Sequence, residues 1–214
     1  MKIKFAKSFF KLSLLFCSTL AMSGCYNLAT SKATPGLRPS GGADTSYVVG
    51  VIGVSQESQF RPNEQRLHLR MKGAKDWALI RMKQEPTGST PFDIEEGGRG
   101  VGSLFALALK PGDYEIYYMR LQSGGSQMWS KREFSVPFSI EAGKAFYIGD
   151  FRSSCLSRSL ARGQCHFLYD SRIERDKPLL MKKFPYLPAI QQLQLQDFSD
   201  AFPFIVESNT ALRP

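Results

Sequence analysis

The sequence predicts an all-β protein: an antiparallel β-sandwich of about eight strands with a short C-terminal helix. Two observations predict this fold class. Short segments that are apolar, or that alternate apolar and polar residues, recur through residues 46–174. Glycine- or proline-containing turns separate most of these segments, which is the spacing expected of hairpin-connected strands.

The first predicted strand, residues 46–54, is an almost continuous apolar run, as expected of a strand buried on both faces. Residues 67–72 alternate apolar and polar side chains, which indicates a strand buried on one face. Residues 84–100 hold two prolines and several glycines and are predicted to be a loop. Further strands are predicted over residues 77–83, 101–109, 114–121, 134–141, 145–154 and 164–174.

Three features refine the C-terminal half. Pro137 has no amide hydrogen to give to a neighbouring strand, so we expect an edge strand or a bulge there. Asp176 is expected to cap a short helix over residues 177–184, with Pro178 in its first turn. Residues 191–196 fit either a helix or an edge strand, and the apolar residues between 202 and 206 are expected to pack back on the domain.

The first 24 residues have the composition of a secretory signal peptide. Four lysines and no acidic residue precede a short apolar stretch over residues 12–22. That stretch is shorter than the roughly 20 residues needed to cross a bilayer. Small residues, Ser23 and Gly24, then mark a cleavage boundary.

The sequence Met22-Ser23-Gly24-Cys25 resembles the bacterial lipobox, although that box favours leucine at the position of Met22. The resemblance implies that the Cys25 thiol receives a diacylglycerol, that the chain is cut before it, and that the acylated residue anchors the protein in membrane lipid. The alternative is an ordinary signal peptide cut near Ala21, with Cys25 an incidental thiol.

The residue after the cysteine bears on localisation. In the lipoprotein class an aspartate there is associated with retention in the inner membrane, and this chain has Tyr26. The resemblance therefore implies the outer membrane, on its periplasmic face. Residues 25–45 are predicted to be the lipidated N-terminus and a flexible tether, because residues 26–45 are rich in Ser, Thr, Gly, Ala and Pro without periodicity. Residues 46–214 then form the folded domain.

The charge balance limits the class of partner. The whole chain has a formal charge of +9, and without the four leader lysines 24 basic residues face 19 acidic ones, or +5. This modest excess suits anionic lipid or another acidic envelope partner. No dense basic stripe with interleaved aromatic residues appears, which excludes nucleic acid as the expected partner.

Cys155 and Cys165 are the two thiols left in the predicted domain. In an oxidising compartment they are expected to form a disulfide across a loop between two strands. The alternative is a metal site that adds His166, but this spacing matches no familiar zinc pattern. The expectation is therefore a disulfide and no metal.

Two motifs resemble a known group of proteins. Residues 109–114 (LKPGDY) and 142–149 (AGKAFYIG) resemble strand pairs of small bacterial envelope lipoproteins with an immunoglobulin- or transthyretin-like sandwich. The resemblance covers roughly residues 100–175 and implies the fold. It implies no catalytic residue or cofactor.

Candidate chemical groups are scattered. His68 is expected to be exposed, and Glu95-Glu96 are expected to be solvated loop acids. Residues 97–100 (GGRG) resemble a phosphate loop only superficially, because no Lys-Ser/Thr follows. No catalytic group is predicted. Arg152, Arg158 and Arg162 surround the cysteine loop, as a basic contact loop for an anionic partner or as a solvated hairpin.

The function expected from the sequence is a membrane-anchored cell-envelope lipoprotein with a non-enzymatic interaction or structural role. The alternative is an envelope hydrolase or ligand carrier with a site built from loops.

Overall fold

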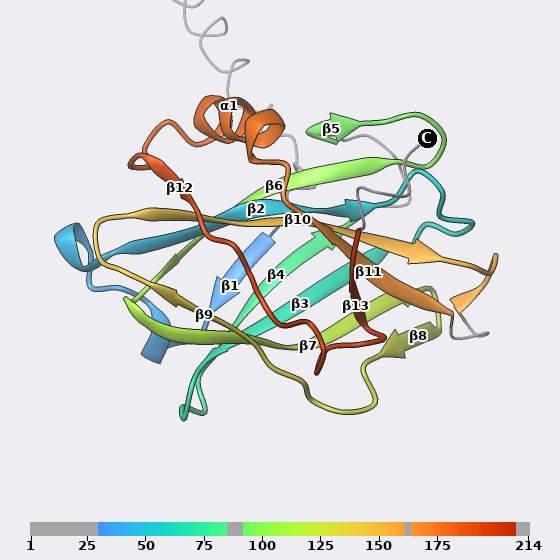
Figure 1. Ribbon diagram of the computed structural model, residues 1–214, viewed down its shortest axis with the longest axis horizontal. Coiled ribbons are helices and arrows are strands. Elements are labelled where there is room, and N and C mark those ends of the chain that lie inside the picture. Colours follow the sequence, from blue (N-terminus) through green and yellow to red (C-terminus); the bar gives the residue numbers. More distant parts are fainter. Residues whose placement is uncertain (1–29, 85–91, 161–163, 209–214) are drawn as a thin grey trace, which may run out of the picture.

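The computed structural model describes residues 30–84, 92–160 and 164–208. Two β-sheets face each other across a shared core, and an α-helix lies on the outside of one sheet (Figure 1). The prediction of a sandwich-like all-β fold is therefore confirmed. The described residues form thirteen strands, more than the predicted eight or so, because several short edge strands carry no clear sequence pattern.

The first sheet has the strand order β1-β4-β3-β7-β8, with β9 also paired to β7. Every pairing in it is antiparallel. Among the described residues β9 pairs with β7 alone, so Pro137 lies on an edge strand, as predicted. The strands are β1 (Thr30–Ala33), β3 (Glu64–Met71), β4 (Trp77–Lys83), β7 (Gly112–Ser123), β8 (Ser126–Trp129) and β9 (Val136–Ile140).

The second sheet has the order β13-β11-β10-β2-β6-β5, with β12 also paired to β10. This sheet is mixed, because β10 runs parallel to β2 and β12, and β13 runs parallel to β11. The prediction of a purely antiparallel sandwich is wrong here, since β2 and β10 are not joined by a hairpin. The strands are β2 (Ser46–Val54), β5 (Ile94–Glu95), β6 (Val101–Leu109), β10 (Ala145–Cys155), β11 (Cys165–Asp170), β12 (Ile190–Gln192) and β13 (Ile205–Glu207).

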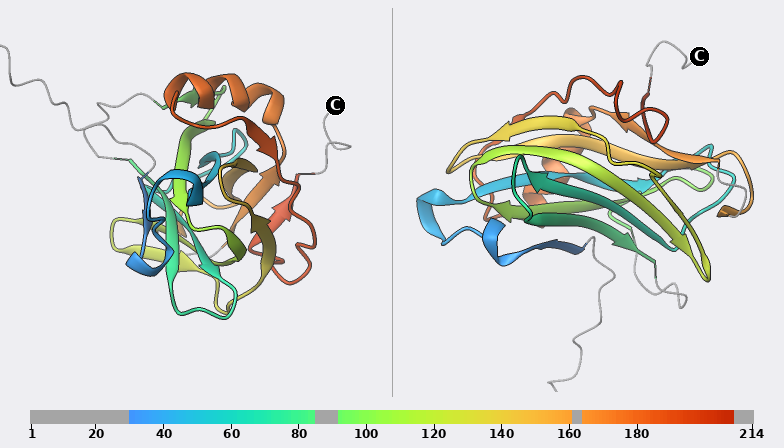
Figure 2. Two further views of the ribbon diagram at one scale, coloured as in Figure 1. Left: turned by 90° about the vertical axis from the view of Figure 1, so that its left-hand side faces the viewer. Right: turned by 90° about the horizontal axis from the view of Figure 1, so that it is seen from below.

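Strand β2 lies between two apolar layers. Val48 and Ile52 face the core between the sheets. Val49 and Val51 face a second apolar cluster beneath α1 (Ile173–Lys183), the helix that covers this sheet (Figure 2). The continuous apolar run in the sequence follows from this burial on both faces.

The segment predicted as a flexible tether is ordered from Thr30 onward. β1 pairs with β4, Leu37 is only 1% exposed, and the Ser31 hydroxyl donates to the Ala106 carbonyl at 2.8 Å. The tether prediction is wrong for residues 30–45. Backbone pairing and the burial of Leu37 offset the conformational entropy that this segment loses when it becomes ordered. Residues 1–29, with the predicted leader and Cys25, lie outside the described residues.

The C-terminal elements differ in detail from the prediction. Helix α1 begins at Ile173 rather than near residue 177, and Arg172 occupies its N-cap position. Asp176 therefore lies inside the first turn, where it is buried. β12 makes residues 190–192 a short strand, and residues 193–196 are neither helix nor strand. The buried Ile205 in β13 packs on the domain as expected, but Phe202 is 63% exposed, contrary to the expectation.

The disulfide prediction is confirmed. Cys155 and Cys165 are directly opposed in the β10–β11 register, with a Cα–Cα distance of 4.1 Å, and they are bonded. Both are buried at one end of the core. The bond therefore closes the β10–β11 loop at its base.

Removing the disulfide should lower stability without altering the fold. We expect the double variant Cys155→Ala/Cys165→Ala to lose about 2.5–3 kcal/mol of unfolding free energy, because the unfolded chain regains the entropy of the open loop. Urea denaturation of both proteins measures this loss, with Arg158→Ala in the same loop as the control. An unchanged urea midpoint in the double variant would contradict the expectation.

Candidate functional site

Charged side chains converge on the outer face of the second sheet, where β10, β11 and β5 meet the start of α1. The members of this charged network are Glu96, Asp150, Arg152, Asp170, Arg172, Arg175 and Asp176. Asp150 and Asp176 have fully buried side chains, and that of Arg152 is 5% exposed. So many buried charges in a β-rich domain require mutual pairing.

A bulge in β10 places Asp150 in this network. The register with β2 shifts between Tyr147 and Asp150, so both side chains point to the outer face although they are three residues apart. Gly149 makes the shift possible: its φ is +124°, and an added Cβ would lie 2.3 Å from the Tyr169 ring. Without the bulge, strand alternation would turn Asp150 into the apolar core.

Arg175 connects the helix to the sheet. Its guanidinium donates to Asp150 and to Glu96, each at 2.6 Å, and to Asp176 at 2.6 Å. Burial lowers the pKa of Arg175, but the carboxylates of Asp176 and Asp150 outweigh this and raise it overall. Arg175 is thus held as a cation that neutralises buried acids.

Arg152 occupies a slot built from two glycines. Gly53 in β2 and Gly102 in β6 are register partners. A Cβ on Gly53 would lie 2.9 Å from one terminal nitrogen of Arg152, and a Cβ on Gly102 would lie 2.7 Å from the other. Nε of Arg152 donates to Asp150, and Glu96 lies 3.9 Å from its Nη2. Within the described residues, neither Nη atom has a hydrogen-bond partner.

Tyr147 and Asp176 form a buried pair beneath α1. The Tyr147 hydroxyl donates to Asp176 at 2.5 Å and accepts the backbone N–H of Arg172 at 3.3 Å. Burial raises the pKa of Asp176, and burial together with the neighbouring Asp176 carboxylate raises the pKa of Tyr147. The phenol therefore stays protonated and serves as a hydrogen-bond donor to the helix.

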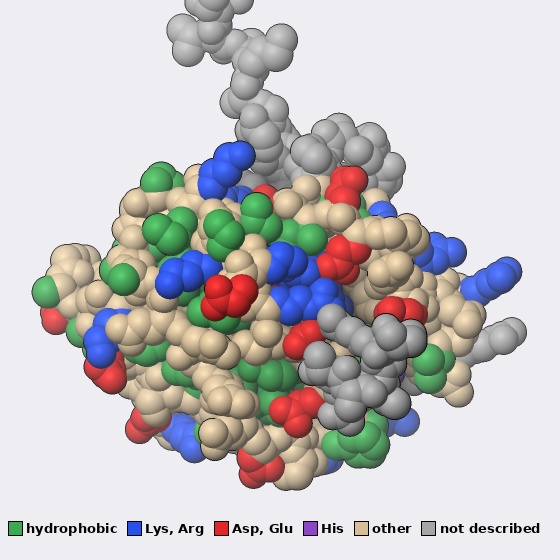
Figure 3. Space-filling view, turned by 45° about the horizontal axis from the view of Figure 1, so that its top comes forward, with side chains coloured by type: hydrophobic (Ala, Val, Ile, Leu, Met, Phe, Trp, Pro, Cys, Tyr) green, Lys and Arg blue, Asp and Glu red, His purple; other side chains and the backbone are tan. Residues whose placement is uncertain are grey.

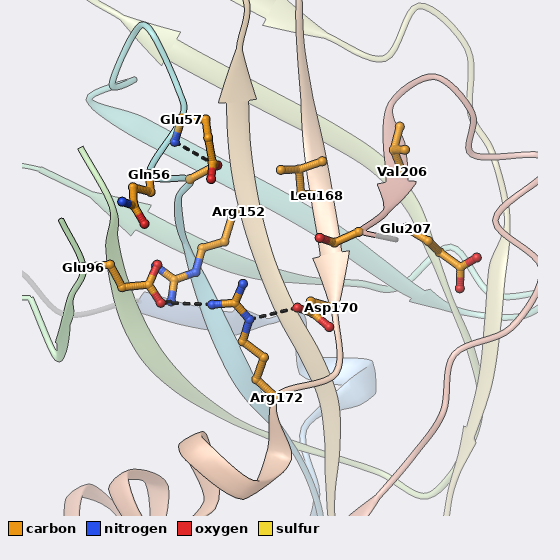
Figure 4. A pocket seen from close by; sticks show the side chains of 11 residues that line it. Gln56, Glu57, Glu96, Arg152, Leu168, Asp170, Arg172, Val206 and Glu207 are labelled. Atoms are coloured by element: carbon orange, nitrogen blue, oxygen red, sulfur yellow. Dashed lines mark hydrogen bonds and ion pairs between the residues drawn. The ribbon is translucent and has the colours of Figure 1, made fainter. Parts of the chain in front are cut away.

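An open polar cleft of about 710 Å³ adjoins the network. In Figure 4, Arg152 points toward Glu96, and Arg172 joins Glu96 to Asp170. Three of the four acids on its walls have donors: Arg172 bonds Glu96 at 3.0 Å and Asp170 at 2.9 Å, and the Ser55 hydroxyl bonds Glu57 at 2.5 Å, while the fourth, Glu207, is exposed. These ion pairs are better suited to holding α1 against the sheet than to acid–base catalysis. Acid–base catalysis needs a carboxyl group that is free to exchange a proton with a substrate.

A second hollow of about 670 Å³ lies at the disulfide end of the molecule, between β8, the loop after β10 and the tail. Trp129 is 48% exposed and Leu156 is 63% exposed at its edge. Cys165 and His166 also line it. This end presents apolar side chains that a closed core would bury.

The predicted basic contact loop is not assembled as expected. Arg152 lies buried in the charged network, because its guanidinium pairs with Asp150 on the sheet face. Arg158 is exposed in the loop after β10. Arg162 lies outside the described residues. Of the three arginines, the structure places Arg158 alone at an exposed position in that loop.

Other sequence expectations need correction too. Glu96 is bonded by two arginines rather than freely solvated, because the β5–β6 pairing and the turn over residues 97–100 bring it to the sheet. His68 is half-buried among aromatic rings, not exposed, and its pKa falls to about 4 through burial and the nearby Arg66 and Arg120. Across the described ranges, no group of three or more potential metal ligands occurs.

Comparison of the chain with protein-family models, with curated proteins and with solved structures found no match. Within the part of the chain that the structure describes, no helix has the length and apolar character needed to span a membrane.

The charged network generates a stability prediction. Replacing Arg152 with Met leaves Asp150 with one guanidinium instead of two, and we expect the unfolding free energy to fall by about 3 kcal/mol. Arg158→Met is the matched control: it removes an exposed arginine six residues away and should change stability by less than about 0.5 kcal/mol. Chemical denaturation measures both, and equal losses would refute the structural role of Arg152.

His68 generates a pH prediction. Its pKa is about 4 in the folded protein and about 6.5 in an unfolded chain, so protonation favours unfolding. Its contribution to stability is complete above pH 6.5 and is lost as the pH falls toward 4. Between pH 7 and pH 5, we expect the unfolding free energy of the wild type to fall by about 1 kcal/mol more than that of His68→Gln. Denaturation midpoints measured from pH 7 to 4 test this, and parallel pH profiles would contradict it.

Proposed function

We propose that this protein is an exported cell-envelope lipoprotein, anchored through acylated Cys25, whose domain has a non-enzymatic interaction or structural role. The observation that carries the proposal is the end of the sandwich fastened by Cys155 and Cys165. Disulfides persist in oxidising compartments such as the bacterial periplasm, which supports export. The exposed apolar side chains around the adjoining hollow support contact with a partner.

The charged network supports a binding role over catalysis. Its carboxylates are engaged by Arg152, Arg172 and Arg175, and the network fixes α1 to the sheet. The lipobox-like sequence ending at Cys25 supports the anchor, and Tyr26 supports the outer membrane. The partner class is a protein or an anionic envelope component, in keeping with the net positive charge.

Acyl labelling tests the anchor. Cells that express the wild-type chain should incorporate labelled palmitate into it, and Cys25→Ala should abolish that incorporation because it removes the acceptor thiol. Cys17→Ala is the control, since Cys17 belongs to the predicted leader and its loss should leave labelling intact. Palmitate on the Cys25→Ala protein would overturn the proposal.

Density-gradient separation of the two membranes tests the location, and wild-type protein confined to the inner membrane would refute the outer-membrane assignment alone.

A further inference from the structure

The ordered N-terminal strand shortens the connection to the proposed anchor. β1 begins at Thr30, five residues after Cys25. Five residues of fully extended chain span at most about 17 Å. If Cys25 is acylated, as proposed above, the bilayer surface must lie close to the edge of the domain from which β1 starts.

That edge adjoins one end of α1. The Ser31 hydroxyl bonds the carbonyl of Ala106 in β6, and Ala106 packs against the apolar cluster beneath α1. Two residues along β6, the carbonyl of Leu104 accepts a hydrogen bond from Lys183, the last residue of α1, at 3.4 Å. Ser31 near the start of β1 and Lys183 at the end of α1 therefore contact backbone carbonyls two residues apart on the same strand.

The outer face of α1 and the turn after it combine apolar and basic side chains with one exposed acid, Glu174 in the first turn. Met181 is 55% exposed and Tyr186 is 61% exposed, and Lys177 and Lys182 are exposed beside them. Neither lysine forms an ion pair with another described residue. Figure 3 turns this side toward the viewer and shows hydrophobic and basic side chains, with some acidic ones between them, over its upper part.

The inner face of the helix cannot turn outward. Leu180 is fully buried in the apolar cluster, and Arg175 and Asp176 are tied to β10 by the charged network. The apolar and basic face is thus presented rigidly. This pairing of apolar and cationic side chains is typical of helices that lie at a membrane interface.

We propose that this face, defined by Lys177, Met181, Lys182 and Tyr186, rests on the bilayer that holds Cys25. The two lysines bind anionic phospholipid headgroups, and Met181 and Tyr186 enter the boundary between headgroups and acyl chains. The proposal rests on the proposed anchoring at Cys25, which supplies the proximity. It assigns one side of the domain to lipid and leaves the disulfide end free for a partner.

Chemical anchoring tests the proposal directly. The chain from Cys25 onward contains every described strand and helix, and its Cys25 thiol can be coupled to a maleimide lipid in vesicles while the disulfide protects the other two cysteines. Lysine acetylation is then followed by mass spectrometry on vesicles of phosphatidylcholine alone and on vesicles that also contain phosphatidylglycerol. We expect Lys177 and Lys182 to react about threefold or more slowly on the anionic vesicles. Lys72 and Lys75, exposed in the β3–β4 turn of the other sheet, are internal controls and should react equally on both.

A variant separates docking from mere proximity. Met181→Asp/Tyr186→Asp changes two exposed side chains, and it should restore the acetylation of Lys177 and Lys182 on anionic vesicles to the rate on neutral ones. Equal protection of all four lysines, or protection of none, on wild-type protein would overturn the docking proposal. Because Cys25 is coupled to lipid chemically, the acetylation result does not depend on whether cells acylate Cys25. Palmitate labelling tests that acylation separately.

Discussion

The position of α1 depends on the ion pair between Arg175 of the helix and the buried Asp150 of β10. The helix contributes Leu180 to the apolar cluster beneath it, and its polar contacts with β10 are the Arg175–Asp150 ion pair and the hydrogen bond from Tyr147 to Asp176. Removing a carboxylate from water costs several kcal/mol, which only well-placed cationic donors recover. The network therefore favours one position of the helix, because a shift would separate Arg175 from Asp150 and Asp176 from the Tyr147 hydroxyl.

That pairing follows in turn from an irregularity of the backbone. The shift in β10 at Gly149 changes which residues face outward, so that Tyr147 and Asp150 both point toward α1. The glycines opposite each other in β2 and β6 leave room for the Arg152 guanidinium to lie against the sheet. Three glycines therefore determine which charged side chains meet at this site: Gly149 through the register shift, and Gly53 and Gly102 through the space that they leave for Arg152.

Local patterns were enough to predict several elements. The apolar run of β2, the edge position of Pro137 and the disulfide follow from residues close together in the sequence. The charged network was not predictable in this way, because Glu96 and Arg175 are 79 residues apart and strict alternation would place Asp150 in the core. The ordered segment after Thr30 was missed for a similar reason: its composition suggests disorder, and the partner that orders it, β4, lies about 50 residues further on.

The parallel pairing of β2 with β10 also limits when the second sheet can be completed. β2 ends at Val54 and β10 begins at Ala145, so about 90 residues separate the two central strands of one sheet. A chain delivered from its N-terminus, by a ribosome or through a translocation pore, presents β2 and its other neighbour, β6, before β10 arrives. Such long-range pairing slows folding and prolongs exposure to self-association. The antiparallel partners β3 and β4 are joined by a short turn, so that hairpin can form before β10 has emerged.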